Sequence, residues 1–206
     1  MTASPLIRSK LGFPRIAGDI VPRPRLLERL EQGLREAHPL FLVSAPAGSG
    51  KSTLLAGWLK ERPEEVAWLS LDRSDNDPIR FIRYLVAALQ GVDDRVGSSL
   101  EPALSSPEPA PAELLVSQLA EDLADLARDV LLVLDDYHLV DSPQVDDALA
   151  FLMDHLPPLV HLVVTTREDP RLPLSRLRAR DEITELRASD LRFTPDEAAV
   201  FLNDAM

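Results

Sequence analysis

The sequence predicts an α/β fold in which helices cover both faces of a mostly parallel sheet. Short apolar runs alternate along the chain with longer segments whose apolar residues recur at helical spacing. The run at 130–134 is apolar throughout, which is typical of a central parallel strand buried on both faces. Because ligands of such sheets bind at the carboxyl ends of the strands, the functional residues are expected directly after the apolar runs.

The first half of the chain predicts two strands, each followed by a helix. Pro24 opens a helix over 24–37, in which leucines recur at helical spacing. The apolar run 40–43 predicts the first strand, and a turn-rich loop then leads into a helix that begins at Lys51. A second strand is expected at 66–71, followed by Asp77 and Pro78, which cap a helix reaching Leu89.

The second half begins with a segment of different composition. Residues 91–111 are rich in Gly, Ser and Pro and predict a flexible connector. A leucine stripe at 114–126 predicts a helix that packs on the core, and 130–134 is the next strand. A helix from Ser142 to about 155, strands at 159–164 and 183–186, and a short helix at 175–180 follow. Thr194 and Glu197 form a capping box at the start of the last helix.

Composition and charge limit the possible functions. The 206 residues fit one domain, 21–206, preceded by an N-terminal extended segment, 1–20. A net charge of −12 argues against binding nucleic acid or an anionic membrane through bulk electrostatics. The chain has no Cys, no export signal and no apolar stretch long enough to cross a membrane, so we expect a cytoplasmic protein.

The loop between the first strand and its helix carries the most specific motif. Residues 45–52, APAGSGKS, match the phosphate-binding pattern G-x-x-x-x-G-K-[ST] (Walker A), except that Ala45 stands where the first Gly is usual. Backbone N–H groups of such a loop surround a phosphate, the lysine reaches the β and γ oxygens, and the hydroxyl binds Mg²⁺. A Gly-rich turn with a solvated lysine is the alternative. The predicted nucleotide-binding residues are Pro46, Ala47, Gly48, Ser49, Gly50, Lys51, Ser52 and Thr53.

Polar residues also follow two later strands. Asp135 and Asp136 end the run at 130–134, so Asp135 is expected to hold Mg²⁺ and Asp136 to polarise the attacking water. Two adjacent acids also suit a strand-to-loop cap, which is the alternative. After the next strand, Thr166 or Arg167 is a candidate sensor of the γ-phosphate. The alternative for Arg167 is a solvated side chain paired with a neighbouring carboxylate.

Several motifs together resemble the nucleotide-binding domain of MalT-type LuxR-family transcriptional activators, which belong to the STAND class of P-loop ATPases. The resemblance covers nearly the whole chain in the same order. The matching segments are VPRPRLL at 21–27, APAGSGKST at 45–53, WLSLD at 68–72, DNDPIRF at 75–81, LDDYH at 134–138 and TREDP at 166–170. Asp181 departs from the family pattern, which has Gly at the end of its LRARG-like stretch.

The resemblance implies a P-loop NTPase three-layer sandwich of about five strands in the order 5-1-4-3-2. It also implies an ATP/ADP switch with Mg²⁺, in which slow hydrolysis resets an oligomerising form. Arg23 would border the adenine, and Arg167 would sense the γ-phosphate. DNA would be contacted only through a domain that is not in this chain, since the sensor and helix-turn-helix regions of the family are absent here.

The function predicted from the sequence is therefore an ATP-binding and slowly ATP-hydrolysing regulatory domain. The alternative is a non-catalytic nucleotide-binding interaction module or a truncated remnant of a regulator. No lysine is followed two residues later by Asp, so the guanine-reading N-K-x-D motif of GTPases is lacking. A small-molecule kinase is disfavoured because no acceptor site or Arg-rich lid is evident.

Overall fold

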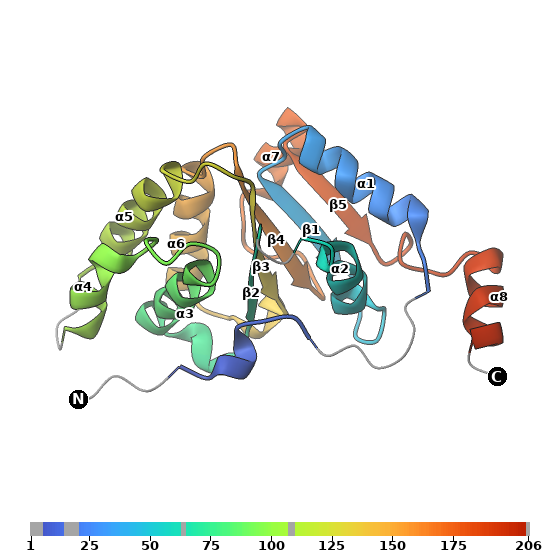
Figure 1. Cartoon of the computed structure of the whole chain (residues 1–206), viewed down its shortest axis with the longest axis horizontal. Helices are drawn as coiled ribbons and strands as arrows, with labels where there is room; N and C mark the ends of the chain where they lie inside the picture. The colour runs from blue at the N-terminus through green and yellow to red at the C-terminus, as the bar shows by residue number, and fades with distance from the viewer. Residues whose placement is uncertain (1–5, 15–20, 63–64, 107–109, 205–206) are drawn as a thin grey trace.

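The computed structural model describes residues 6–14, 21–62, 65–106 and 110–204, with the side chains of 201–204 left aside. Its centre is one sheet in which all neighbouring strands are parallel, in the order β2-β3-β4-β1-β5 (Figure 1). This is the predicted order 5-1-4-3-2 read from the other edge, so the prediction is confirmed. The strands are β1 (Leu40–Ser44), β2 (Val66–Ser70), β3 (Val130–Asp135), β4 (Val160–Thr166) and β5 (Ile183–Arg187).

Helices cover both faces of the sheet, as the alternating pattern predicts. In Figure 1, α1 and α2 lie to the right and α3, α5 and α6 to the left. The helices of the first face are α1 (Pro24–Arg35) and α2 (Lys51–Leu59). Those of the second are α3 (Pro78–Gln90), α5 (Ala112–Ala124), α6 (Pro143–Asp154) and α7 (Leu174–Arg180), and α8 (Pro195–Asp204) stands at the end of the chain.

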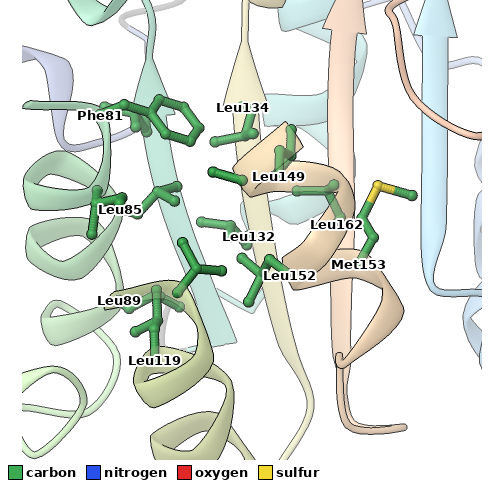
Figure 2. Close-up of a cluster of buried hydrophobic side chains, with 14 of the residues drawn as sticks. Phe81, Leu85, Leu89, Leu119, Leu132, Leu134, Leu149, Leu152, Met153 and Leu162 are labelled. Atoms are coloured by element: carbon green, nitrogen blue, oxygen red, sulfur yellow. The ribbon is translucent and has the colours of Figure 1, made fainter. Parts of the chain in front are cut away.

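The alternation of side chains along each strand divides the core into two parts. Leu132 and Leu134 of β3 pack with α3, α5 and α6, as Figure 2 shows, whereas Leu131 and Val133 pack on the face of α1 and α2. Every residue of β3 is buried. Since burying one leucine contributes about 2 kcal/mol, this two-sided core fixes the sheet firmly enough to position the residues at its edge.

The strand register brings the predicted site residues together at the carboxyl ends of the strands. Ser44, the last residue of β1, lies opposite Thr166 of β4, and Ser70 of β2 lies opposite Asp135 of β3. All five strands run in the same direction, so their carboxyl ends form a single edge. The loops that carry the phosphate-binding motif and the acidic pair therefore meet there.

Two segments differ from what the sequence predicts. The expected connector, 91–111, contains a 3₁₀ turn, η4 (Ser98–Leu100), and a short helix, α4 (Glu101–Ser105). Its apolar residues Val96, Leu100 and Leu104 are buried in the core, which explains why a Gly- and Ser-rich segment is folded there.

The N-terminal segment also departs from an extended conformation in its described part. Residues 8–10 form a 3₁₀ turn, η1 (Arg8–Lys10), while 1–5 and 15–20 of the expected segment lie outside the described residues. The buried Lys10 ammonium contacts Asp75 and lies 3.2 Å from the Asp72 carboxylate, and Phe13 lies on Trp68 with ring centroids 5.4 Å apart. Lys10 Nζ also lies 4.3 Å from the centroid of the Tyr84 ring of α3, so this segment packs on β2, on the turn that follows it and on α3. Among the described helices, none is long and apolar enough to cross a membrane.

Candidate nucleotide-binding site

The loop between β1 and α2 has the backbone that a phosphate cradle needs. Gly48 (φ 76°) and Gly50 (φ 82°) both adopt the left-handed conformation, which costs side-chain-bearing residues free energy. Gly50 is also the N-cap residue directly before α2. Ala45, where the motif usually has Gly, is not among the described residues with positive φ, and it is buried at the end of β1. The substitution at this position is therefore compatible with the loop.

Lys51 lies in the first turn of α2 and turns back over the loop. Its ammonium Nζ donates hydrogen bonds to the carbonyl oxygens of Ala45 (2.9 Å) and Pro46 (3.2 Å). The residue is 6% exposed, and burial lowers the pKa of the Lys51 ammonium, while the nearby Asp136 carboxylate opposes this shift. A buried cation whose partners are only neutral carbonyls is well placed to bind a phosphate.

Ser52 and Asp135 come together from positions 83 residues apart. The Ser52 hydroxyl donates to Asp135 Oδ1 (2.8 Å), and the Thr165 hydroxyl of β4 donates to the same oxygen (2.6 Å). Asp135 is 5% exposed, and this burial raises the pKa of its carboxyl although both hydroxyl groups favour the charged form. The side chain is thus fixed by two neighbours at the carboxyl edge of the sheet.

These oxygens are the donors that Mg²⁺ prefers, together with phosphate oxygens and water. Within the described part of the chain, no group of three or more His, Cys, Asp or Glu residues is arranged to hold a metal ion on its own. The donor set of Ser52 and Asp135 therefore fits a metal that arrives with a nucleotide rather than one held by a protein cage.

Asp136 is held differently from its neighbour. Its backbone adopts the left-handed conformation (φ 60°), and its N–H donates to the Thr165 hydroxyl (2.9 Å). No hydrogen bond to its carboxylate is recorded among the described residues, and the side chain is 46% exposed. The imidazole of His138 lies near this carboxylate, with Nδ1 at 3.8 Å from Oδ1.

The two candidate sensor residues at the end of β4, Thr166 and Arg167, have different surroundings. The Thr166 hydroxyl is buried and donates to the carbonyl of Glu168 (2.7 Å), so it belongs to the turn. Arg167 is exposed, and its charge lowers the pKa values of Lys51 and His138, which places it beside the phosphate loop. Asp169 is paired with Arg178 and Arg187 instead, and none of the ion pairs among the described residues includes Arg167.

A cavity of about 1150 Å³ opens next to the phosphate loop. Segments that are far apart in the sequence surround it: the start of α1, the loop and α2, and the residues between β5 and α8. Of the predicted nucleotide-binding residues, all except Lys51 line it. Its lining includes Arg23, Gly48, Ser52, Leu191 and Phe193.

Arg23 joins the two ends of the domain at this cavity. Its guanidinium donates to the carbonyl oxygen of Arg192 (3.0 Å) and to Glu197 Oε2 (3.3 Å), and it lies 4.9 Å from the ring centroid of Phe193. Glu197 closes the predicted capping box, because it accepts from the N–H of Thr194 (3.0 Å). These contacts link the residue before α1 to the start of α8 and the loop before it, and Figure 1 shows both at the right end of the molecule.

Sequence reasoning missed two parts of this site. Thr165 was not selected, although it bonds both Asp135 and the backbone of Asp136, and the only signal was its place beside Thr166 at the end of an apolar run. The wall made by Leu191 and Phe193 was also missed, since single apolar residues in a loop give no periodic pattern.

Comparisons with known proteins identify the family of the chain. Residues 23–165 match the model of the AAA ATPase domain family. The chain is 37% identical over 198 residues to the HTH-type transcriptional regulator MalT of Klebsiella pneumoniae and 34% identical over 197 residues to MalT of Vibrio parahaemolyticus. Each match covers 96% of this chain and 22% of the relative, so the chain spans about a fifth of the length of these regulators.

Among solved structures, Cdc6p of Pyrobaculum aerophilum is similar in fold, with a TM-score of 0.60 and 17% identity over 91% of this chain and 51% of that one. A Drosophila ORC structure with AT-rich DNA and Cdc6 follows, with a TM-score of 0.52 and 16% identity over 88% of this chain and 59% of that one. An ATPase fold implies that the domain binds a nucleotide. From its family match and its similarity to MalT, the chain belongs to the AAA ATPase domain family.

Proposed function

We propose that this chain is the ATP-binding and slowly ATP-hydrolysing switch domain of a transcription regulator similar to MalT. The observation that carries the proposal is the contact of Ser52, the neighbour of Lys51, with Asp135, because Ser52 also lines a cavity large enough for a nucleotide. Asp135 lies 83 positions after Ser52, and a nucleotide with Mg²⁺ is the ligand that uses Lys51, Ser52 and Asp135 together.

The phosphates would lie on the loop between β1 and α2. Gly48 and Gly50 have no side chains, and the space beside the backbone at both positions is open, so a phosphate could approach the backbone N–H groups there. Lys51 would exchange its two carbonyl partners for phosphate oxygens, a pairing that is stronger because it is charge-assisted. The N-terminus of α2 adds a favourable dipole.

The metal ligands would be Ser52 and, directly or through water, Asp135. A metal held by these two residues would supply positive charge to offset the charge that develops on the phosphates during transfer of the terminal one. Asp136 would orient the attacking water, and Arg167 would contact the γ-phosphate. The charge balance supports this assignment, because Lys51 and Arg167 bring two cations to the same edge as Asp135 and Asp136.

The base would occupy the wider part of the cavity, where Arg23, Leu191 and Phe193 lie. Arg23 is engaged with backbone carbonyls and with Glu197, so its role would be to shape the wall. Through this contact the nucleotide would influence the position of α8. Self-association in the ATP form and DNA contact through another domain are proposed from the similarity to MalT alone.

Calorimetric titration with Mg–ATP tests the binding step. Lys51→Ala is expected to weaken ATP binding by at least about 100-fold, because a buried charge-assisted contact to phosphate is lost. Arg35→Ala, which removes an exposed positive charge from the end of α1, serves as the control and should bind as wild type does. Equal affinities for Lys51→Ala and wild type would refute the phosphate cradle.

Single-turnover hydrolysis tests the switch step. Asp136→Asn should bind Mg–ATP with wild-type affinity and release phosphate about 100-fold more slowly, as expected when a water-polarising carboxylate is lost. A wild-type protein that binds Mg–ATP but releases no phosphate would favour the non-catalytic binding module. A rate unchanged by Asp136→Asn would exclude the role proposed for this residue.

A further inference from the structure

His138 carries two buried polar atoms that the proposed reaction leaves unexplained. Its side chain is 8% exposed, and neither Nδ1 nor Nε2 has a hydrogen-bond partner among the described residues. A buried polar group without a partner costs stability, and such groups in native proteins usually have a functional reason. His138 lies three residues after Asp135, so its functional reason is expected in the candidate nucleotide-binding site.

The neighbour of this imidazole is the carboxylate of Asp136. Nδ1 and Oδ1 are 3.8 Å apart, so an approach of about 1 Å would give a hydrogen bond. The main chain of Asp136 is fixed by the bond from its N–H to Thr165, while its carboxylate has no recorded hydrogen bond among the described residues. By contrast, Asp135 accepts from two hydroxyl groups. Of the two acids, only Asp136 still needs a group to orient it.

The turn that carries His138 is itself anchored. This turn is η5 (Tyr137–Leu139), and the buried Tyr137 hydroxyl donates to Asp146 Oδ1 of α6 (2.7 Å). The N–H of Leu139 donates to the carbonyl of Asp136 (3.0 Å), which closes the turn. The imidazole is thus presented to Asp136 from a rigid support, as a residue that orients another must be.

The charges around His138 favour its neutral form. Burial lowers the pKa of the imidazole, the charges of Arg167 and Lys51 lower it further, and the carboxylates of Asp136 and Glu168 oppose these effects. Near neutral pH the ring therefore has one N–H to donate. A neutral donor can orient a carboxylate without taking its charge away, which a water-polarising group requires.

We propose that His138 is a positioning residue for Asp136, whose carboxylate accepts a hydrogen bond from Nδ1–H of the imidazole and is thereby held toward the attacking water. The inference rests on the proposed function, since the orientation of Asp136 affects a rate only if the chain hydrolyses ATP. His138 touches neither the phosphates nor the metal ligands in this arrangement.

Three variants separate this role from a structural one. In His138→Asn an amide N–H lies near the position of Nδ1, in His138→Gln it lies nearer to that of Nε2, and His138→Leu has no donor. We expect His138→Leu and His138→Gln to lower the single-turnover rate by about tenfold or more, and His138→Asn to restore it to within about threefold of wild type. The affinity for Mg–ATP should not change. A wild-type rate in His138→Leu, or equal losses in all three variants, would overturn the proposal.

A double variant checks that the effect passes through Asp136. In an Asp136→Asn background, His138→Leu should cause no further loss of rate, because the group to be oriented has already been altered. A second loss as large as that in the wild-type background would contradict the proposal.

A measurement without nucleotide keeps the inference independent of the proposed activity. Nitrogen-15 NMR at neutral pH should find His138 with its proton on Nδ1, and Asp136→Ala should shift both ring nitrogens or change the tautomer. A proton on Nε2, or a spectrum unchanged in Asp136→Ala, would refute the contact. If wild type released no phosphate while the NMR contact was present, the proposed hydrolysis would fail and the contact would stand.

Discussion

Replacing the Asp135 carboxylate by an amide should stabilise the nucleotide-free protein and abolish the contribution of Mg²⁺ to ATP binding. Burial raises the pKa of Asp135 in the folded state above its unfolded value. A carboxyl of this kind stabilises the fold most below its unfolded pKa, and that stability is lost as the pH rises through the folded pKa. At pH 7 the charged form is therefore unfavourable, and Asp135→Asn relieves it.

The expected change in the free energy of unfolding on Asp135→Asn is the difference between two opposing contributions. Losing the charge-assisted part of the bonds from Ser52 and Thr165 costs about 1 kcal/mol each. Burying the ionised carboxylate costs several kcal/mol, and the raised pKa indicates that this cost is the larger one. We expect a net gain on the order of 1 kcal/mol in the free energy of unfolding, or roughly 2–4 °C in melting temperature for a chain of this size.

Thermal unfolding followed by circular dichroism provides the assay. At an ATP concentration of about 100 times Kd, wild type should gain about 2.7 kcal/mol, and chelating Mg²⁺ should reduce that gain. The gain of Asp135→Asn should be the same with and without Mg²⁺. Asp147→Asn, at an exposed position of α6, is the control. A nucleotide-free Asp135→Asn that is less stable than wild type would refute the burial argument, and a retained Mg²⁺ effect would refute the metal assignment.

Three further substitutions test other parts of the structure. Gly33→Ala should cost about 1–3 kcal/mol in urea unfolding, because its Cβ would lie 1.8 Å from Thr184 Oγ1, and an unchanged stability would contradict the close approach of α1 to β5. Ala45→Gly should leave the calorimetric ATP affinity within about twofold of wild type, since this position does not need left-handed backbone; a tenfold gain would indicate that Ala45 weakens the cradle. Glu197→Ala should cost about 3 kcal/mol by leaving the buried Arg23 guanidinium without its carboxylate, and a loss below about 0.5 kcal/mol would mean that the pair does not hold α8.

The sequence predicted what depends on local pattern. The main strands contain apolar residues in short runs and most helices have apolar spacing or a capping residue, so local pattern predicted the order of these elements along the chain. The order of strands in the sheet came from the family resemblance, and the structure confirms it. The phosphate loop was also predictable from the sequence. Its motif has Gly directly before Lys, and Gly50 adopts the left-handed conformation that favours glycine at this position. Asp181 stands where the family pattern has Gly, and it adopts the left-handed conformation (φ 56°) at the end of α7. Asp tolerates this conformation better than most residues do.

The parts that escaped prediction depend on contacts between distant residues. Lys10 reads as a surface lysine in a segment without pattern, yet it is buried against Asp75, 65 positions away. Arg23 reads as a residue before a helix, but its partners lie 167 to 174 positions away. The role of Thr165 likewise depends on the register of β3 and β4. Contacts between residues so far apart in the sequence depend on the folded arrangement of the elements, so a local pattern does not predict them.

The most direct test of the central claim is a crystal structure of this chain with Mg²⁺ and a non-hydrolysable ATP analogue. The account predicts the β- and γ-phosphates within hydrogen-bond distance of Lys51 Nζ, and Mg²⁺ at about 2.0–2.1 Å from the Ser52 hydroxyl. The base should lie in the cavity bordered by Arg23 and Phe193. A nucleotide bound elsewhere, or bound on the loop with Lys51 still on the carbonyl of Ala45, would contradict it.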